Sequence, residues 1–129
     1  MPVCSVWIGG SFITSKMDPA DLDVTWIVHR EDFERIRSDT KTAQMIERFA
    51  RSKLKPKVSI DSYMMAYEAI PQPDMSEHVQ KRYWIPRGHW DDWWQRARHT
   101  AKGLDPTPLD AAPCRGYVEV ILDGYRKAN

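Results

Sequence analysis

The feature that most constrains this chain is a pair of carboxylates within an apolar segment. Residues 22–28 read Leu-Asp-Val-Thr-Trp-Ile-Val, and such β-branched and aromatic runs are typical of a strand. Side chains alternate between the two faces of a strand. Asp21 and Asp23 are therefore expected on one face, about 7 Å apart, while Leu22 points from the other face into the core. The segment predicts a strand with one acidic face.

A glycine-rich turn precedes this strand. The apolar run Val3–Ile8 predicts a buried strand that stops at Gly9. Gly10 lets the backbone approach a phosphate closely, and Ser11 offers both an N–H and a hydroxyl to phosphate oxygens. Lys16 is near enough in sequence to add positive charge. Carboxylates beside such a loop suit a divalent metal that carries a nucleotide, although glycine and serine are also ordinary turn residues.

A third carboxylate follows on another expected strand. Residues 58–62 predict a strand with Val58 and Ile60 on one face and Asp61 on the other. If that strand lies beside the first acidic strand, Asp61 completes a magnesium site, which needs only one to three protein carboxylates. Two metals about 3.5–4 Å apart would stabilise both oxygens of an in-line displacement. Asp61 could also help to deprotonate the acceptor, or simply start a turn.

The remaining segments predict the fold. Apolar residues recur at helical spacing between residues 31 and 54, which predicts a helix over part or all of this span, closed by Pro56. After a break at residues 71–73, short helices are expected over 75–83 and 90–98. Residues 103–114 predict a surface loop and residues 117–122 a last strand. We therefore expect one α/β (α+β) domain over residues 1–129, in which helices back a small mixed β-sheet.

Composition excludes several classes of protein. The 129 residues can bury a core of their own, and 42% hydrophobic with 29% charged residues is typical of a soluble globular protein. No apolar run approaches the roughly 18 residues that a membrane span needs. We expect a cytoplasmic protein with no membrane partner, in which Cys4 and Cys114 are reduced. The scattered histidines form no zinc-type pair with either cysteine.

A tryptophan stripe offers a second functional reading. Three of the six tryptophans recur at helical spacing near several arginines. Aromatic rings stack on nucleic-acid bases at about 1–3 kcal/mol each. The same pattern is more typical of a core or an interface, and we favour that interpretation. The tryptophans are Trp90, Trp93 and Trp94, and the arginines are Arg87, Arg96 and Arg98.

The acidic strand and its turn also resemble a known signature. Gly10-Ser11, nine intervening residues and then Asp21-Leu22-Asp23 resemble the motif of the DNA polymerase β-like nucleotidyltransferase superfamily. In that superfamily a third carboxylate stands on a later strand, and Asp61 is similar to it. Many members carry a helix before the first strand, whereas the first expected strand of this chain begins at residue 3.

A narrower resemblance covers the same region. Residues 6–16 and 18–24 look like a poorly characterised family of bacterial and phage nucleotidyltransferase-like proteins. That family tends to end in a strand led by glycine, which residues 115–120 also resemble. The strong part of the resemblance covers residues 6–28.

The resemblance implies a fold, a cofactor and a reaction class. It implies a nucleotidyltransferase-like core, Mg²⁺ or Mn²⁺, and an NTP, ATP foremost, whose NMP is transferred to a protein or to RNA such as tRNA. The metal-binding and catalytic residues implied are Asp21, Asp23 and Asp61. The nucleotide-binding residues implied are Gly10, Ser11 and Lys16.

Two alternatives stay open. The superfamily includes antitoxins and inactive copies, so the chain is also compatible with a non-catalytic binding module. Such an antitoxin or regulatory subunit would dock a partner through the aromatic residues of segment 84–94, in a homo- or hetero-oligomer. A metal-dependent nuclease is a third reading, because it too needs clustered acids. The Gly-Ser element would then have no evident purpose.

Overall fold

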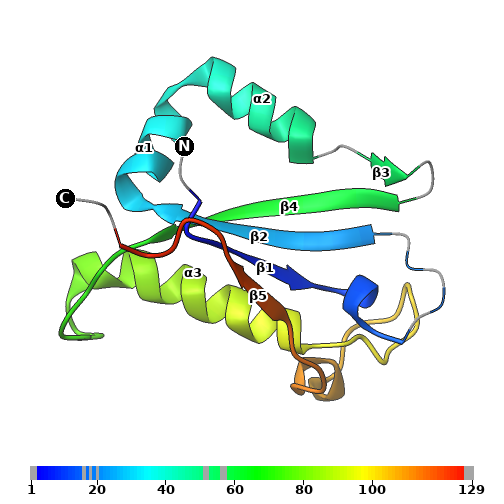
Figure 1. Cartoon of the computed structure of the whole chain (residues 1–129). Coiled ribbons are helices and arrows are strands. Elements are labelled where there is room, and N and C mark those ends of the chain that lie inside the picture. Colours follow the sequence, from blue (N-terminus) through cyan, green and yellow to red (C-terminus); the bar gives the residue numbers. More distant parts are fainter. Residues whose placement is uncertain are drawn as a thin grey trace.

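A mixed β-sheet of five strands forms the centre of the protein (Figure 1). The computed structural model describes residues 3–15, 17, 19, 21–50, 53–55 and 58–126. The strands are β1 (Ser5–Gly9), β2 (Asp21–His29), β3 (Lys53–Lys55), β4 (Val58–Tyr67) and β5 (Val118–Ile121). The helices are α1 (Arg30–Ser38), α2 (Thr40–Ala50) and α3 (His78–Gln95), with short 3₁₀ turns η1 (Ser11–Ile13) and η2 (Pro108–Ala111). The expected α+β fold is confirmed.

The sheet has one parallel pair among antiparallel neighbours. Its order is β3-β4-β2-β1-β5, and only β2 and β4 run parallel among the pairs of the described strands. Parallel neighbours need a crossover connection, which α1, α2 and β3 provide here. None of the helices in the described ranges is long and apolar enough to cross a membrane.

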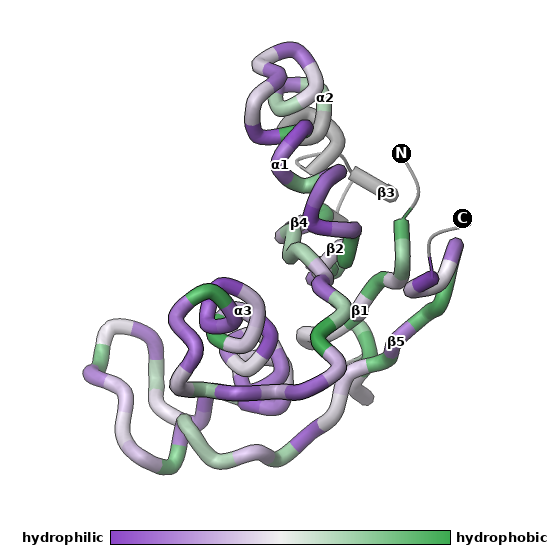
Figure 2. The backbone as a smooth tube through the Cα atoms, turned by 90° about the vertical axis from the view of Figure 1, so that its left-hand side faces the viewer, coloured by the Kyte–Doolittle hydropathy of each residue, from purple (hydrophilic) through white to green (hydrophobic). Residues whose placement is uncertain are grey.

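Both faces of the sheet carry a hydrophobic cluster. Helix α3 lies on one side of the sheet (Figure 2), where Trp94 packs with Trp7 and Ile27. The opposite face gathers Val6, Val24 and Ile60. The prediction that the core lies on the face opposite the aspartates is only half right. Ile27 shares the aspartate face of β2 and is fully buried, because α3 covers that face.

The segment expected to be one helix is two. Helix α1 ends at Ser38 and α2 begins at Thr40. The carboxylate of Asp39 accepts hydrogen bonds from the Lys41 N–H at 3.2 Å and from the Thr42 hydroxyl, so it caps the start of α2. Leu54, which its spacing placed in the helix, lies in β3. Pro56, the expected terminator, falls outside the described residues.

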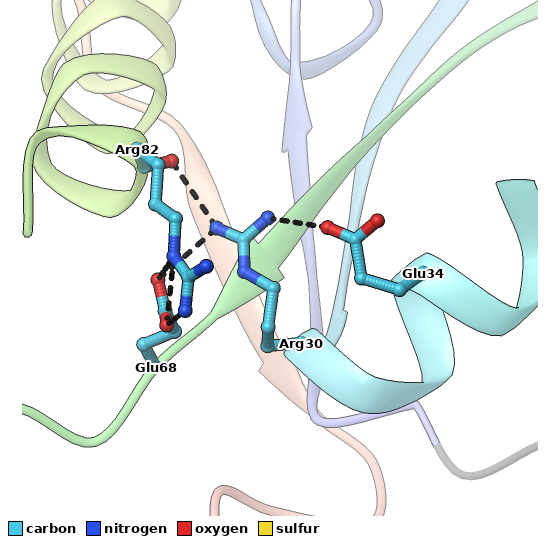
Figure 3. Close-up of polar contacts among 4 residues, drawn as sticks. All are labelled: Arg30, Glu34, Glu68 and Arg82. Carbon is cyan, nitrogen blue, oxygen red and sulfur yellow. Dashed lines mark hydrogen bonds and ion pairs between the residues drawn. The ribbon is translucent and has the colours of Figure 1, made fainter. Parts of the chain in front are cut away.

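The two short helices expected near the tryptophans are a single helix. Helix α3 runs through Pro86, which has no N–H to donate to the carbonyl of Arg82 one turn earlier. The Nη2 of Arg30 donates to that carbonyl at 3.2 Å (Figure 3). A side chain at the start of α1 thus replaces the hydrogen bond that the proline removes, and this contact helps α3 to continue.

The same arginine belongs to a network that joins three elements. Glu68, directly after β4, accepts hydrogen bonds from Arg30 Nη2 at 3.2 Å and from Arg82 Nε at 3.0 Å (Figure 3). Arg30 Nη1 also donates to Glu34 at 3.3 Å. The hydrogen bond from Arg82, together with the charge of Arg30, holds the pKa of Glu68 below its ordinary value. The network ties α1 and α3 to the end of β4.

A double-mutant cycle tests the repair at Pro86. Arg30→Ala is expected to lower the free energy of unfolding by about 1–3 kcal/mol, since it removes hydrogen bonds to a charged group. In a Pro86→Ala background the new N–H can donate to the Arg82 carbonyl, so the cost should fall by about 0.5–1.5 kcal/mol. Urea unfolding of the four proteins measures this. Equal costs in both backgrounds would contradict the repair.

A pH series tests the Glu68 network. Because folding lowers the pKa of Glu68, its stabilisation is complete above the ordinary value of 4.5 and is lost as pH falls through the folded-state pKa. Glu68→Gln should cost about 1–3 kcal/mol near neutral pH, and the cost should shrink below pH 4.5. Glu77→Gln, an exposed change, is the control. A Glu68→Gln cost that stays constant down to acid pH would refute the assignment.

Candidate functional site

Three carboxylates form an acidic row on one face of the sheet: Asp21, Asp23 and Asp61. The parallel register of β2 and β4 sets Asp61 directly beside Asp23. Neighbouring strands lie about 4.8 Å apart, and Asp21 falls on the same face because it is two residues before Asp23. The structure therefore brings together the three aspartates that the sequence singled out.

The electrostatic environment of the acidic row acts on Asp23. Burial raises the pKa of Asp23, and the neighbouring carboxylates of Asp61 and Asp21 raise it further, whereas Arg115 lowers it. Among the described residues, no three carboxylate, imidazole or thiol groups are arranged so that they could hold a metal ion by themselves. Mg²⁺ keeps several waters and takes phosphate oxygens, so one or two carboxylates suffice for it. The donor set suits Mg²⁺ together with a phosphate ligand.

The glycine turn is shaped by the residues that it covers. Gly10 has a φ of 77°, and a Cβ on it would lie 1.8 Å from Oδ2 of Asp23. A Cβ on Gly9 would lie 2.9 Å from the ring of Trp94. The Gly-Gly pair is therefore needed for close packing over Asp23 and Trp94. Ser11 starts η1, which lies against β2, whereas Lys16 falls outside the described residues.

A cleft of about 480 Å³ adjoins the acidic row. The carboxyl-terminal end of α3 and the segment after it form much of its wall. The cleft combines one carboxylate of the row with aromatic rings and three arginines. Its lining residues are Asp23, Tyr63, Trp93, Trp94, Arg96, Arg98, Pro106, Asp110 and Arg115.

Two of the three arginines in the cleft are engaged within the protein. Arg96 donates from Nε to Asp92 at 2.7 Å. Arg98 donates to the backbone carbonyl of Leu104 at 2.7 Å and thereby holds the loop after α3. Arg115 differs, because its Nε is buried without a hydrogen-bond partner among the described residues. Arg115 is therefore the arginine best placed to meet a ligand.

Asp110 organises the loop that borders the cleft. Its carboxylate accepts hydrogen bonds from the backbone N–H groups of His99 at 2.6 Å, Thr100 at 2.8 Å and Thr107 at 2.7 Å. The Thr100 hydroxyl donates to it as well. This hydrogen bond, with those from the backbone, holds the pKa of Asp110 well below its usual range. Its oxygens serve the loop, so we do not assign Asp110 to a ligand.

The tryptophan stripe divides between the core and the cleft. Trp94 is 3% exposed and donates from Nε1 to the Thr25 hydroxyl at 2.9 Å, which confirms a core role for this residue. Trp90 stacks on Trp94 at a centroid distance of 5.6 Å. Trp93 is 50% exposed and lines the cleft. Arg87, expected near the stripe, packs over the ring of Trp7.

The fold and the acidic row together define a small α+β protein with a carboxylate-bearing parallel strand pair. Residues 1–120 match the model of DUF6932, a family of unknown function, and the chain belongs to that family. No curated protein matches the chain. No solved structure matches it either.

Glycine substitutions test the close packing over Asp23. Gly10→Ala should lower the free energy of unfolding by about 1–3 kcal/mol more than Gly103→Ala. Both glycines have positive φ, but a Cβ on Gly103 meets nothing within 4 Å, so Gly103→Ala reports backbone strain alone. Thermal unfolding of the two variants measures the difference. Equal losses would show that Asp23 does not restrict this turn.

Proposed function

We propose that this protein is a metal-dependent nucleotidyltransferase that transfers an NMP from an NTP to a hydroxyl of a protein or RNA acceptor. The observation that carries the proposal is the pairing of Asp23 with Asp61 on adjacent parallel strands, with Asp21 on the same face. The Gly10 turn and the cleft that contains Arg115 adjoin this acidic row.

Each element has a role in the proposed reaction. The acidic row would hold Mg²⁺ or Mn²⁺ together with triphosphate oxygens, and the bound metal would neutralise charge on the phosphates. Gly10 and Ser11 would present backbone groups to the triphosphate, and Arg115 would add positive charge. The acceptor oxygen attacks the α-phosphorus. The bond between the α-phosphorus and the oxygen that bridges it to the β-phosphorus breaks, and pyrophosphate leaves. A carboxylate oxygen of Asp61 takes the proton from the acceptor hydroxyl.

A second candidate is a non-catalytic nucleotidyltransferase-like binding module, such as an antitoxin or a regulatory subunit. Two observations favour it. Within the described residues the acidic row is not a complete metal ligand set, and Arg115 already places a positive charge near Asp23. A module of this kind would dock a partner and would bind a nucleotide weakly or not at all.

Label transfer distinguishes the two candidates. The protein is incubated with Mg²⁺ or Mn²⁺, NTPs labelled at the α- or γ-phosphate, ATP first, and cellular RNA or protein as acceptor. Label from the α-phosphate alone is expected in the acceptor. Asp23→Asn and Asp61→Asn should each reduce the transfer by about 100-fold or more.

Asp74→Asn is the matched control for this assay. Asp74 is exposed and lies in the segment between the end of β4 and α3, away from the acidic row. The control should transfer label at the wild-type rate. Transfer that persists in Asp23→Asn would contradict the proposed metal site. No heat of ATP and Mg²⁺ binding in calorimetry, with no label transfer and a stable partner complex on pulldown, would favour the module.

A further inference from the structure

The exposed tryptophan of the cleft has a position that core packing does not explain. Trp93 is 50% exposed, whereas the adjacent Trp94 is 3% exposed and belongs to the core. Trp93 lies nearly parallel to the His89 ring, with 9° between the planes and 6.4 Å between the centroids. The helix therefore presents a large, supported aromatic ring at the wall of the cleft.

Of the three arginines that line the cleft, Arg115 is the one best placed to bind a ligand. Arg96 is paired with Asp92, and Arg98 donates hydrogen bonds to loop carbonyls, so both side chains are already bound within the protein. Arg115 keeps a buried Nε without a partner in the described part of the chain and lines the same cleft as Asp23. A guanidinium in this setting matches a phosphate, which it can bind through two parallel hydrogen bonds.

A ligand that contacts Trp93, Arg115 and the acidic row together needs a flat ring to stack and phosphates that bind both a guanidinium and a metal ion. We infer that Trp93 stacks on the base of the bound nucleotide while Arg115 binds its phosphates next to the acidic row. This assignment rests on the proposed function. The cleft of about 480 Å³ brings Trp93, Arg115 and Asp23 into a single lining.

The hydrogen bonds of the other cleft residues bear on how the base is selected. Three of the polar side chains that share the cleft with Trp93 are engaged within the protein: Arg96 with Asp92, Arg98 with carbonyls, and Asp110 with backbone N–H groups. They are not available to read the edges of a base. Stacking tolerates every base because each has a π-face. The site should accept all four NTPs, with a modest preference for the larger purines.

Calorimetry tests this base seat, the site formed by Trp93 and Arg115. The ligands are α,β-methylene analogues of the four NTPs and inorganic tripolyphosphate, all in the presence of Mg²⁺. Trp93→Ala should weaken nucleotide binding by about 5- to 150-fold and leave tripolyphosphate binding unchanged. Trp93→Phe should recover most of the affinity. Arg115→Gln should weaken the binding of both ligands by about tenfold or more. The four analogues should bind to the wild type within about tenfold of one another.

Two control variants match these changes. Ile85→Ala removes an exposed apolar side chain from the same helix. Arg126→Gln removes an arginine from a separate hollow, lined by His29 and Tyr67 at the other end of the parallel strands. Both controls should bind nucleotide as the wild type does. A Trp93→Ala variant that behaves like Ile85→Ala would overturn the base seat.

The remaining outcomes separate this inference from the proposed function. Nucleotide binding that depends on Trp93 and Arg115 without α-phosphate transfer supports the seat and contradicts the transferase. Transfer that is unaffected by Trp93→Ala supports the transferase and overturns the seat. Binding of single-stranded RNA without any binding of free NTP also overturns the seat. More than about 100-fold preference for one base would contradict selection by stacking.

Discussion

The parallel pairing of β2 with β4 is the constraint on which the rest of the structure depends. Its register sets Asp23 beside Asp61, and a shift by one residue would turn one aspartate to the other face of the sheet. Parallel neighbours cannot be joined by a tight hairpin, so the chain must leave β2 and return through α1, α2 and β3. The acidic row is thus a consequence of topology as well as of sequence.

The helices hold this pair from both ends. Near the acidic row, Trp94 of α3 packs over Gly9 of β1 and donates a hydrogen bond to the hydroxyl of Thr25 in β2. Trp94 therefore joins the cleft wall to both strands. At the other end, Glu68 binds Arg30 and Arg82. The carbonyl of Arg82, left without its helical donor by Pro86, is bonded by Arg30 (Figure 3). One side chain of α1 thereby fastens α3 and the end of β4.

Short-range sequence patterns predicted the features that depend on neighbouring residues alone. The period of two in a strand placed Asp21 and Asp23 on one face, and the turn at Gly9 ended β1 as expected. Asp39 carried a capping signal that the apolar spacing obscured. The continuity of α3 was not predictable, because Arg30, distant in sequence, replaces the bond lost at Pro86. The place of Arg115 in the cleft was not predicted either, because Arg115 is distant in sequence from Asp23 and the loop after α3 brings the two residues to one cleft.

The central claim is that the acidic row binds a divalent metal together with a nucleotide. Electron paramagnetic resonance of Mn²⁺ with an α,β-methylene NTP tests it most directly, in the wild type and in Asp23→Asn and Asp61→Asn. The account predicts that nucleotide promotes Mn²⁺ binding to the wild type and that either substitution abolishes this effect. Bound Mn²⁺ that is indifferent to nucleotide and to both substitutions would contradict it.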